Sequence, residues 1–368
     1  MKITVFLTRG GSLNVWNDKG ILSRELQIYK ELEKFGINTT LITYGNGSQC
    51  NVGSELGNID YCLNKYNLPL RIYEKSIPLI HWKSLRHTDL IKTNQTNGAL
   101  VALSAARIWK KPLISRCGYL WSEFAERDFG VHANVTQKAM FTENKVFTGA
   151  TANVFTTQDM LDSATNRIGE LSESYVIPNF VDTELFKPDE QIDHNTDVLF
   201  IGRFEKQKNL GSLLKATQIV DCSITLIGNG TLESQVKDCL AKNIRRTLLI
   251  DNVPHAEIPL YMRSAKVFVL PSYFEGHPKV LLEAMACGMA VVGADSPGIR
   301  NVIEHGKTGL LCSTEPSDIE NAIQRLLRED GLRVLLGKNA REYVENNCSL
   351  SAVSRMESDL MHKLVYQV

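Results

Sequence analysis

The sequence predicts an α/β protein made of two Rossmann-like lobes, each built on a parallel sheet. Short apolar segments rich in β-branched residues alternate with amphipathic segments of helical spacing along most of the 368 residues. A polar stretch, residues 183–197, interrupts this alternation, and the same pattern restarts after it. With 43% hydrophobic residues, the chain is long enough for two domains of about 180 residues each.

The first lobe, residues 1–182, opens with a strand, a glycine turn, a helix and a second strand. The pair Gly10-Gly11 follows the first strand, where it either lets the backbone approach an anionic ligand or only completes a turn. Both interpretations suit a lone glycine pair equally well. The expected strands of this lobe are 3–7, 38–44, 79–80, 90–93, 112–115 and 153–157, and its expected helices are 20–35, 99–109, 140–149 and 158–167.

The second lobe, residues 183–348, repeats the alternation after the polar linker. Its expected strands are 198–201, 223–227, 247–250, 267–270 and 290–292, and its expected helices are 210–219, 232–240 and 279–287. Two further amphipathic helices, 321–336 and 349–364, complete the chain and are expected to pack against the lobes.

Composition argues against several classes of protein. Lys and Arg together number 41 and so do Asp and Glu, which does not suggest binding to nucleic acid. The eight cysteines are scattered without a C-x-x-C pair, so we expect small buried side chains rather than zinc ligands or disulfides. No apolar run approaches the roughly 20 residues of a membrane helix, and the chain begins with a strand rather than a signal peptide. We therefore expect a cytoplasmic protein whose membrane contact, if any, is peripheral.

One carboxylate lies in an unusual place. The helix 279–287 is apolar almost all the way round, yet it contains Glu283, and a buried carboxylate is costly unless it is paired. Either Glu283 lies on a narrow exposed stripe and pairs with Lys279 one turn earlier, or it faces a crevice and accepts hydrogen bonds from a ligand's hydroxyls. Helix geometry alone favours the first interpretation.

Two cations follow the first strand of the second lobe. Arg203 and Lys208 are five residues apart in the loop that begins at Gly202. Such a pair can hold a diphosphate, with arginine as a fork and lysine as a point charge. A solvated surface loop is the alternative, and it is the better interpretation of the loop taken alone.

Taken together, these motifs resemble a known family. The chain contains, in this order, the glycine loop Gly10-Gly11, G-R-x4-K at 202–208, and two glutamates separated by seven residues in EGHPKVLLEAMACG; family landmarks are matched by the segments 177–188, 199–209, 226–230, 252–272, 275–292 and 298–311. This order is similar to that of the retaining glycosyltransferases of the family 4 type, which have the GT-B fold of two lobes facing across a cleft. The resemblance covers about 190 residues, and the first lobe matches only in outline. It implies that the first lobe, residues 1–182, would bind the acceptor and the second, residues 183–348, the nucleotide sugar.

The resemblance implies roles for individual residues. Arg203 and Lys208 would bind the diphosphate of a nucleotide-sugar donor, Glu283 the ribose hydroxyls, and Glu275 the donor sugar or its reacting centre. Gly11 would approach the diphosphate from the first lobe. The base would lie near Asn229 and Val253. The implied substrate-binding set is Gly11, Gly202, Arg203, Lys208, Asn229, Val253, Glu275, Gly276, His277, Pro278, Lys279, Val280 and Glu283, of which Glu275, Arg203 and Lys208 would act in catalysis.

The resemblance also implies a reaction that needs neither a metal nor a cofactor. The nucleotide sugar is a substrate, the anomeric configuration is retained, and cations with a helix N-terminus hold the charge of the leaving diphosphate. The final helix, residues 349–368, would pack back on the first lobe. The acceptor would be a glycan or lipid-linked glycan, as in the synthesis of bacterial surface polysaccharide or lipopolysaccharide, with peripheral contact at the cytoplasmic face of the inner membrane.

The chain departs from the family in its first lobe. Many members have a histidine near the donor sugar, whereas the corresponding segment 115–119 has none, and His132 has no assigned place. The turn before Val253 reads Asp251-Asn252 where a glycine is usual. Two alternatives therefore stay open: a GT-B enzyme that transfers no sugar, such as a sugar-nucleotide epimerase or a phosphorylase, and a nucleotide-sugar-binding protein without turnover.

Three further features carry weaker hypotheses. His277 either touches the sugar or lies exposed in its loop. The aromatic side chains of Tyr119, Trp121 and Phe124 either line an acceptor pocket or, as is commoner, pack in the core. Trp82, Lys83, Arg86 and His87 form either a rim at a membrane surface or, more simply, a solvated face.

Overall fold

The computed structural model describes residues 1–46, 53–189, 194–243 and 247–366. The chain forms two compact units, Met1–Pro178 with Val353–Val368, and Asn179–Ala352. The first predicted boundary, 182/183, lies four residues after the observed boundary at 178/179. The second, 348/349, lies four residues before the observed boundary at 352/353. The expected linker 183–197 is not a loose connection in its described part, because Phe186 is fully buried in the core of the second unit. Residues 190–193 of that linker lie outside the described residues.

The first unit contains a seven-stranded sheet in which every pair of neighbouring strands is parallel. The strand order is β3-β2-β1-β4-β5-β6-β7, and Ile3 of the central β1 pairs with Thr39 on one side and Leu90 on the other. The strands are β1 Lys2–Phe6, β2 Asn38–Ile42, β3 Asp60–Cys62, β4 Leu90–Thr93, β5 Leu113–Cys117, β6 Ala152–Phe155 and β7 Glu173–Val176.

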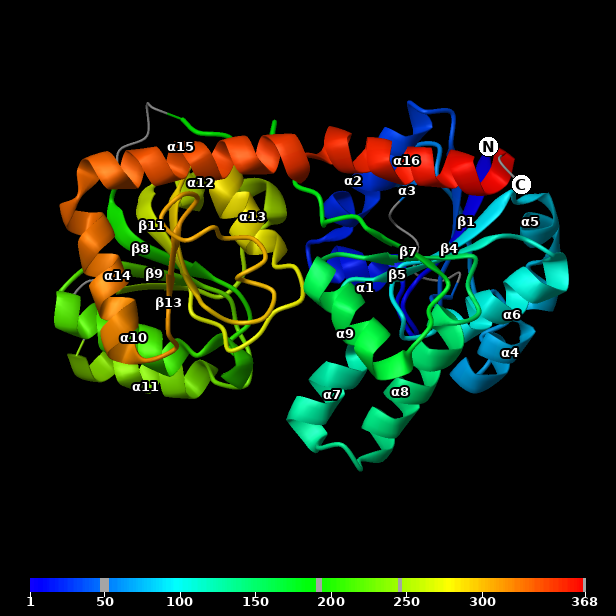
Figure 1. The fold of residues 1–368 in the computed structure, drawn as a ribbon, viewed down its shortest axis with the longest axis horizontal. Coiled ribbons are helices and arrows are strands. Elements are labelled where there is room, and N and C mark those ends of the chain that lie inside the picture. Colours follow the sequence, from blue (N-terminus) through cyan, green and yellow to red (C-terminus); the bar gives the residue numbers. More distant parts are fainter. Residues whose placement is uncertain (47–52, 190–193, 244–246, 367–368) are drawn as a thin grey trace. The chain divides into compact units, whose positions relative to one another are not determined.

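Ten helices belong to this unit in whole or in part, among the residues that are described (Figure 1). Their bounds are α1 Leu13–Asp18, α2 Leu22–Glu33, α3 Gly53–Leu56, α4 Leu70–Ile80, α5 Trp82–His87, α6 Ala99–Trp109, α7 Trp121–Phe129, α8 Asn134–Phe147, α9 Gln158–Ile168 and α16 Leu350–Tyr366. The predicted strand 79–80 is wrong: these residues end α4, whose Tyr73 and Ile77 lie one helical turn apart and are both fully buried.

The C-terminal residues from Val353 onward belong to the first unit. Glu357 of α16 is buried and forms an ion pair with Lys92 of β4, at 2.5 Å. Burial lowers the pKa of Lys92, while the charge of Glu357 acts in the opposite direction. Near the end of the helix, Lys363 pairs with Glu173 of β7. These two contacts attach the last helix to a central strand and to an edge strand of this sheet.

The second unit contains a six-stranded parallel sheet of order β10-β9-β8-β11-β12-β13. Its strands are β8 Thr196–Ile201, β9 Ile224–Ile227, β10 Thr247–Ile250, β11 Ala265–Leu270, β12 Ala290–Ala294 and β13 Leu310–Cys312. Its helices are η2 Lys206–Lys208, α10 Leu210–Val220, α11 Glu233–Asn243, η3 His255–Glu257, α12 Ile258–Arg263, α13 Lys279–Ala286, α14 Pro316–Arg328 and α15 Asp330–Asn347.

The helices cover both faces of this sheet. In Figure 1, α12, α13 and α15 lie on one face of it and α10 and α11 on the other. The predicted single helix 321–336 is wrong, because the backbone breaks at Glu329 (φ −100°, ψ 78°) between α14 and α15. One continuous core of aliphatic and aromatic side chains fills the unit. Among the residues that are described, no helix is long and apolar enough to span a membrane.

Each sheet has one point where the strand order reverses. In the first unit β1 lies between β2 and β4, and in the second β8 lies between β9 and β11. The loops that leave the carboxyl ends of two such strands run in opposite directions, which opens a crevice where α/β proteins bind ligands. The loops after β8 and β11 carry most of the residues predicted for the site.

Candidate functional site

The loop after β8 is fixed by the backbone of the loop after β9. Phe204 is fully buried, and its N–H donates to the carbonyl of Asn229 at 2.7 Å. Gly228 has a φ of +139°, and a Cβ there would lie 2.0 Å from the carbonyl oxygen of Gly202. Only glycine allows this approach, so the two glycine loops are locked together.

Lys208 and Glu275 meet at the reversal of strand order. The Nζ of Lys208 lies 2.6 Å from Oε1 of Glu275, and the two side chains are only 11% and 10% exposed. Gln207, beside Lys208, donates to the carbonyl of Phe274 at 2.6 Å and accepts from the N–H of Tyr273. The loops after β8 and β11 are thus joined through both side chains and backbone.

Arg203 differs from Lys208 although both stand in the same loop. Arg203 is exposed, whereas Lys208 is 8% exposed and already holds a carboxylate. The predicted pair of cations therefore consists of one fixed and one solvent-facing group. A ligand phosphate approaching this loop would meet Arg203 without displacing Glu275.

The loop that carries Glu275 is supported from behind. The N–H of Glu275 donates to the carbonyl of Pro297 at 2.9 Å. Gly298 has a φ of +83°, and a Cβ on it would lie 2.3 Å from the carbonyl oxygen of Gly276. The Pro297-Gly298 turn is a supporting feature that our reading of the sequence missed, although a Pro-Gly dipeptide is a recognisable turn signal.

His277 has a structural place in this loop. It is 6% exposed, its Nδ1 accepts from the N–H of Asn179 at 3.2 Å, and its carbonyl accepts from the side-chain amide of Asn179 at 2.6 Å. The expectation of an exposed loop histidine is wrong, because these bonds and its burial hold it against the start of the second unit. Asn179 was not predicted as part of the site.

Helix α13 begins beside Glu275. Pro278 precedes it, no side chain caps it and no acidic residue stands in its first turn. Lys279 lies over the ring of Phe180, with Nζ 5.0 Å from the ring centroid, and Val280 is half-buried. An N-terminus without an acidic side chain or a side-chain cap is suited to bind an anion through its N–H groups and dipole.

Glu283 is buried and paired, but with a partner that the sequence did not indicate. Its Oε1 lies 2.9 Å from Nε2 of His255, and the two side chains are 6% and 9% exposed. The interpretation of an exposed stripe is therefore wrong, since the apolar surface of α13 and His255 enclose the carboxylate. His255 begins η3, directly after Val253-Pro254, and packs against Phe186 with ring centroids 5.1 Å apart. This links Glu283 to the turn where the base was expected.

The remaining predicted residues lie in two places. Asn229 is exposed at the tip of the loop after β9, and Val253 is half-buried against the core of the second unit. Gly11 belongs to the first unit, where its N–H closes a turn onto the carbonyl of Thr8 at 2.7 Å and Gly10 has a φ of +75°. Turn geometry thus accounts for both glycines, and the approach of Gly11 to a ligand stays a prediction.

A metal centre is not evident in the described part of the chain, where no three His, Cys, Asp or Glu side chains stand close enough to share an ion. In the first unit, the segment without the expected histidine is held by its neighbours. The N–H of Arg116 donates to the hydroxyl of Thr93, and that of Gly118 to the side chain of Gln95. Tyr119 and Phe124 pack on each other with ring centroids 5.0 Å apart.

Residues 182–343 match the model of the family described as glycosyl transferases group 1. Over 183 residues the chain is 31% identical to the amylovoran biosynthesis glycosyltransferase AmsK of Erwinia amylovora, a match covering 45% of this chain and 44% of the relative. The chain spans only about two fifths of the length of curated relatives that it matches (42%, 38% and 44%).

Solved structures resemble the whole chain. A sucrose-phosphate synthase from Thermosynechococcus elongatus superposes with a TM-score of 0.83 at 19% identity, covering all of both chains. Anabaena HepE in complex with UDP-glucose superposes with a TM-score of 0.78 at 18% identity, covering 99% of this chain and 100% of the other. At such identities the likeness shows the fold. The predicted fold class, two Rossmann-like α/β lobes of the GT-B type, is confirmed.

Proposed function

Since this chain carries a glycosyl transferases group 1 domain at residues 182–343, we propose that the protein is a retaining glycosyltransferase. It transfers a sugar from a UDP- or GDP-activated donor to a hydroxyl of a glycan or lipid-linked glycan. The observation that carries this proposal is the buried ion pair of Lys208 and Glu275 at the reversal of strand order, beside the uncapped N-terminus of α13. A cation, a carboxylate and the N-terminus of a helix then surround one crevice.

Charge on the leaving diphosphate is met by positive groups that are already in place. Lys208 is held by Glu275, Arg203 faces solvent in the same loop, and the first N–H groups of α13 are directed out of the helix end. Groups that are oriented before the reaction stabilise developing charge without reorganising, which lowers the barrier. Glu275 then faces the donor sugar, and the reaction proceeds with retention and without a protein nucleophile.

The nucleoside is bound by a second group of residues, which includes Glu283 of α13. Glu283 accepts hydrogen bonds from the ribose hydroxyls, and His255 fixes the orientation of its carboxylate through the 2.9 Å contact. Asn229 and Val253 contact the base from the turns after β9 and β10. A carboxylate already oriented by a neighbouring side chain loses less conformational freedom when the ribose arrives.

UDP is the donor nucleotide that we favour, because HepE, which shares this fold, is described with UDP-glucose. The acceptor is inferred from AmsK, whose name places it in amylovoran biosynthesis. We infer synthesis of a bacterial surface polysaccharide such as lipopolysaccharide, in the cytoplasm with peripheral contact to the inner membrane. For that contact, Trp82 and Lys83 begin helix α5, where Trp82 is 43% exposed.

A thermal-shift panel of UDP-, GDP- and ADP-sugars tests the donor. One nucleotide class should raise the melting temperature at millimolar concentration, because a ligand that binds only the folded state stabilises it by mass action. UDP-sugars are expected to give the largest shift. A panel in which no nucleotide sugar shifts the melting temperature would contradict the proposed function.

Metal independence is tested with a chelator. Turnover of the donor identified by the panel should be unchanged after dialysis against EDTA, since Arg203, Lys208 and the end of α13 take the charge. Loss of turnover that added magnesium or manganese restores would overturn this part of the proposal. Slow hydrolysis of the donor without acceptor would exclude a binding protein that lacks turnover.

A further inference from the structure

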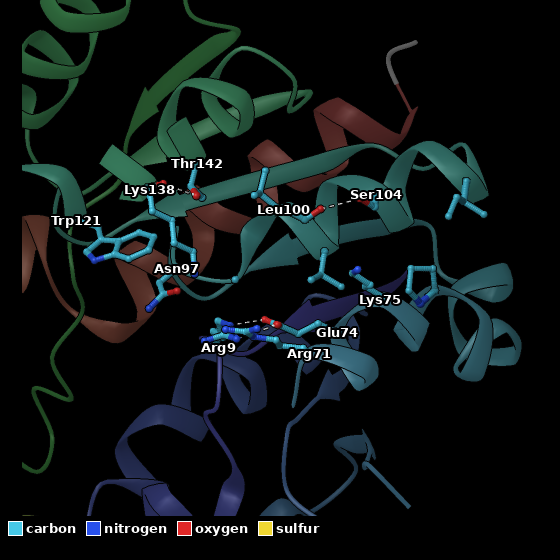
Figure 2. A pocket seen from close by; sticks show the side chains of 14 residues that line it. Arg9, Arg71, Glu74, Lys75, Asn97, Leu100, Ser104, Trp121, Lys138 and Thr142 are labelled. Carbon is cyan, nitrogen blue, oxygen red and sulfur yellow. Dashed lines mark hydrogen bonds and ion pairs between the residues drawn. The ribbon is translucent and has the colours of Figure 1, made fainter. Parts of the chain in front are cut away.

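The first unit contains a cavity of about 660 Å³ at its own reversal of strand order. Arg9 enters it from the loop after β1, and Asn97 and Gly98 from the loop after β4. Helices α4, α6 and α8 form its walls, and Trp121, the first residue of α7, closes one end (Figure 2). The cavity thus occupies in the first unit the topological position that the candidate donor site occupies in the second.

Arg9 at the base of the cavity is fixed. Its Nε and Nη2 donate to the two carboxylate oxygens of Glu74, at 2.6 and 3.1 Å, in a bidentate pair. This hydrogen bonding raises the pKa of Arg9, which therefore stays charged. Since the carboxylate of Glu74 already neutralises Arg9, the pair makes the base of the cavity polar but adds no net charge to it.

Three other cations face the cavity without a partner. Arg71 and Lys75 stand one turn apart on α4, and Lys138 comes from α8 (Figure 2). All three are exposed, and none has an ion pair or hydrogen bond through its side chain to another described residue. Like charges at i and i+4 repel each other on a helix. Four cations and one carboxylate leave a charge of three positive on the lining, which favours an anionic ligand.

Part of the lining is apolar. Leu100, Val101 and Ile108 of α6 form this apolar wall together with Pro78 of α4. Ile108 is 54% exposed, so part of this surface is in water when the cavity is empty. A simple sugar phosphate would use the cations but leave these side chains uncovered. Burial of an alkyl chain against them is favourable, because it removes apolar surface from water.

We propose that this cavity binds the acceptor, and that the acceptor is an amphiphile in which a phosphate or diphosphate carries an apolar chain. The phosphate contacts Arg71, Lys75 and Lys138, and the chain runs along Leu100, Val101 and Ile108. This inference rests on the proposed function, because it names the class of acceptor that receives the sugar. It deepens that function without depending on any residue of the second unit.

Calorimetric titration of the full chain with octyl phosphate, inorganic phosphate and octyl glucoside tests the proposal. Octyl phosphate should bind at least tenfold more tightly than either of the other two, because it alone has both an anionic and an apolar part. Equal affinity for inorganic phosphate would overturn the role of the apolar wall. Equal affinity for octyl glucoside would overturn the role of the cations, and absence of octyl phosphate binding would overturn the whole inference.

Variants locate the binding. The triple variant Arg71→Gln, Lys75→Gln, Lys138→Gln should weaken octyl phosphate binding at least tenfold, whereas Ile108→Asn should weaken octyl phosphate but not inorganic phosphate. Lys145→Gln is the matched control, since Lys145 is an exposed cation on the same helix as Lys138 but does not line the cavity. An unchanged affinity in the triple variant would place the ligand elsewhere and overturn the assignment.

Titration with UDP in the same preparations separates the two proposals. UDP binding should be unchanged in all of these variants, and an unchanged circular-dichroism spectrum and melting temperature show that the first unit is folded in them. A protein that binds UDP but not octyl phosphate would overturn the acceptor inference and leave the proposed function intact. A protein that binds octyl phosphate but no nucleotide would overturn the proposed function and with it the acceptor role, while the binding of a phosphate amphiphile in the cavity would stand.

Discussion

The two reversals of strand order have the same topology but are built differently. In the second unit, Lys208 and Glu275 come from two loops that follow β8 and β11, and a third loop touches the first backbone to backbone at Gly228. In the first unit, Arg9 comes from the loop after β1, but its partner Glu74 comes from helix α4. Helices rather than loops then supply most of the cavity wall.

This difference suggests a division of roles. Loops whose backbones touch leave little room for change, which suits a site for a diphosphate, whose chemistry is the same in every donor. Side chains on helix faces can be exchanged one at a time without moving the backbone, which suits a site that must select one acceptor. The comparison predicts that changes in the second unit impair the reaction, whereas changes in the first unit alter the choice of acceptor.

The largest expected effect is that of Lys208→Ala. This variant removes the fixed cation and should lower turnover about 100- to 1000-fold, as loss of one preorganised charge-stabilising group typically does. Steady-state kinetics with the donor identified by the panel measures it. Lys206→Ala, an exposed lysine two residues earlier in η2, is the control and should keep normal turnover. If Lys208→Ala kept normal turnover, as Lys206→Ala is expected to do, Lys208 would be no more than a residue of a surface loop.

A smaller effect is expected from Glu283→Ala. If Glu283 binds the ribose as proposed, loss of this carboxylate leaves the ribose hydroxyls and His255 without their partner, so the free energy of nucleotide binding should weaken by up to about 3 kcal/mol. Calorimetry with UDP measures the change, and Glu257→Ala, an exposed carboxylate at the end of η3, serves as control. Unchanged UDP affinity would reduce the Glu283–His255 pair to a structural contact.

A pH effect of about 2 kcal/mol is expected in the first unit. His81 is buried at the end of α4, its Nε2 lies 2.7 Å from the hydroxyl of Tyr73, and desolvation lowers its pKa to about 4. Since an unfolded histidine has a pKa near 6.5, the unfolded chain binds the proton first, and stability is lost as the pH falls from about 6.5 towards 4. The free energy of unfolding should therefore drop by about 2 kcal/mol between pH 7 and pH 5.

Urea denaturation at the two pH values, followed for the parent chain and for His81→Gln, measures this contribution. The variant should show a drop smaller by about the same 2 kcal/mol, because it has no imidazole to protonate. An identical pH dependence in both proteins would mean that His81 is protonated as easily in the folded unit as in the unfolded chain.

Local sequence patterns predicted most of the fold. The helix expected at 99–109 is α6, Ala99–Trp109, because an alanine-rich apolar run gives an unambiguous helical pattern. The strand 247–250 likewise corresponds to β10. Two predicted elements were wrong, one because its apolar run was too short and one because its helical pattern continued across a break in the backbone. Leu79 and Ile80 formed an apolar pair too short to distinguish a strand from the end of a helix, and a single backbone break at Glu329 divides an otherwise continuous amphipathic pattern.

For the candidate site, the sequence predicted Lys208, Glu275 and Glu283 through their resemblance to the motifs of a known family, since the loop of Lys208 and the helix of Glu283, each taken alone, favoured a simpler interpretation. It did not determine their partners. That Lys208 pairs with Glu275, and Glu283 with His255 rather than Lys279, was decided by the tertiary structure. The same is true of the cavity around Arg9, whose walls come from segments up to 133 residues further along the chain (Thr142 − Arg9). Periodicity reports which side of an element is buried, but only the packing of distant elements decides which groups meet there.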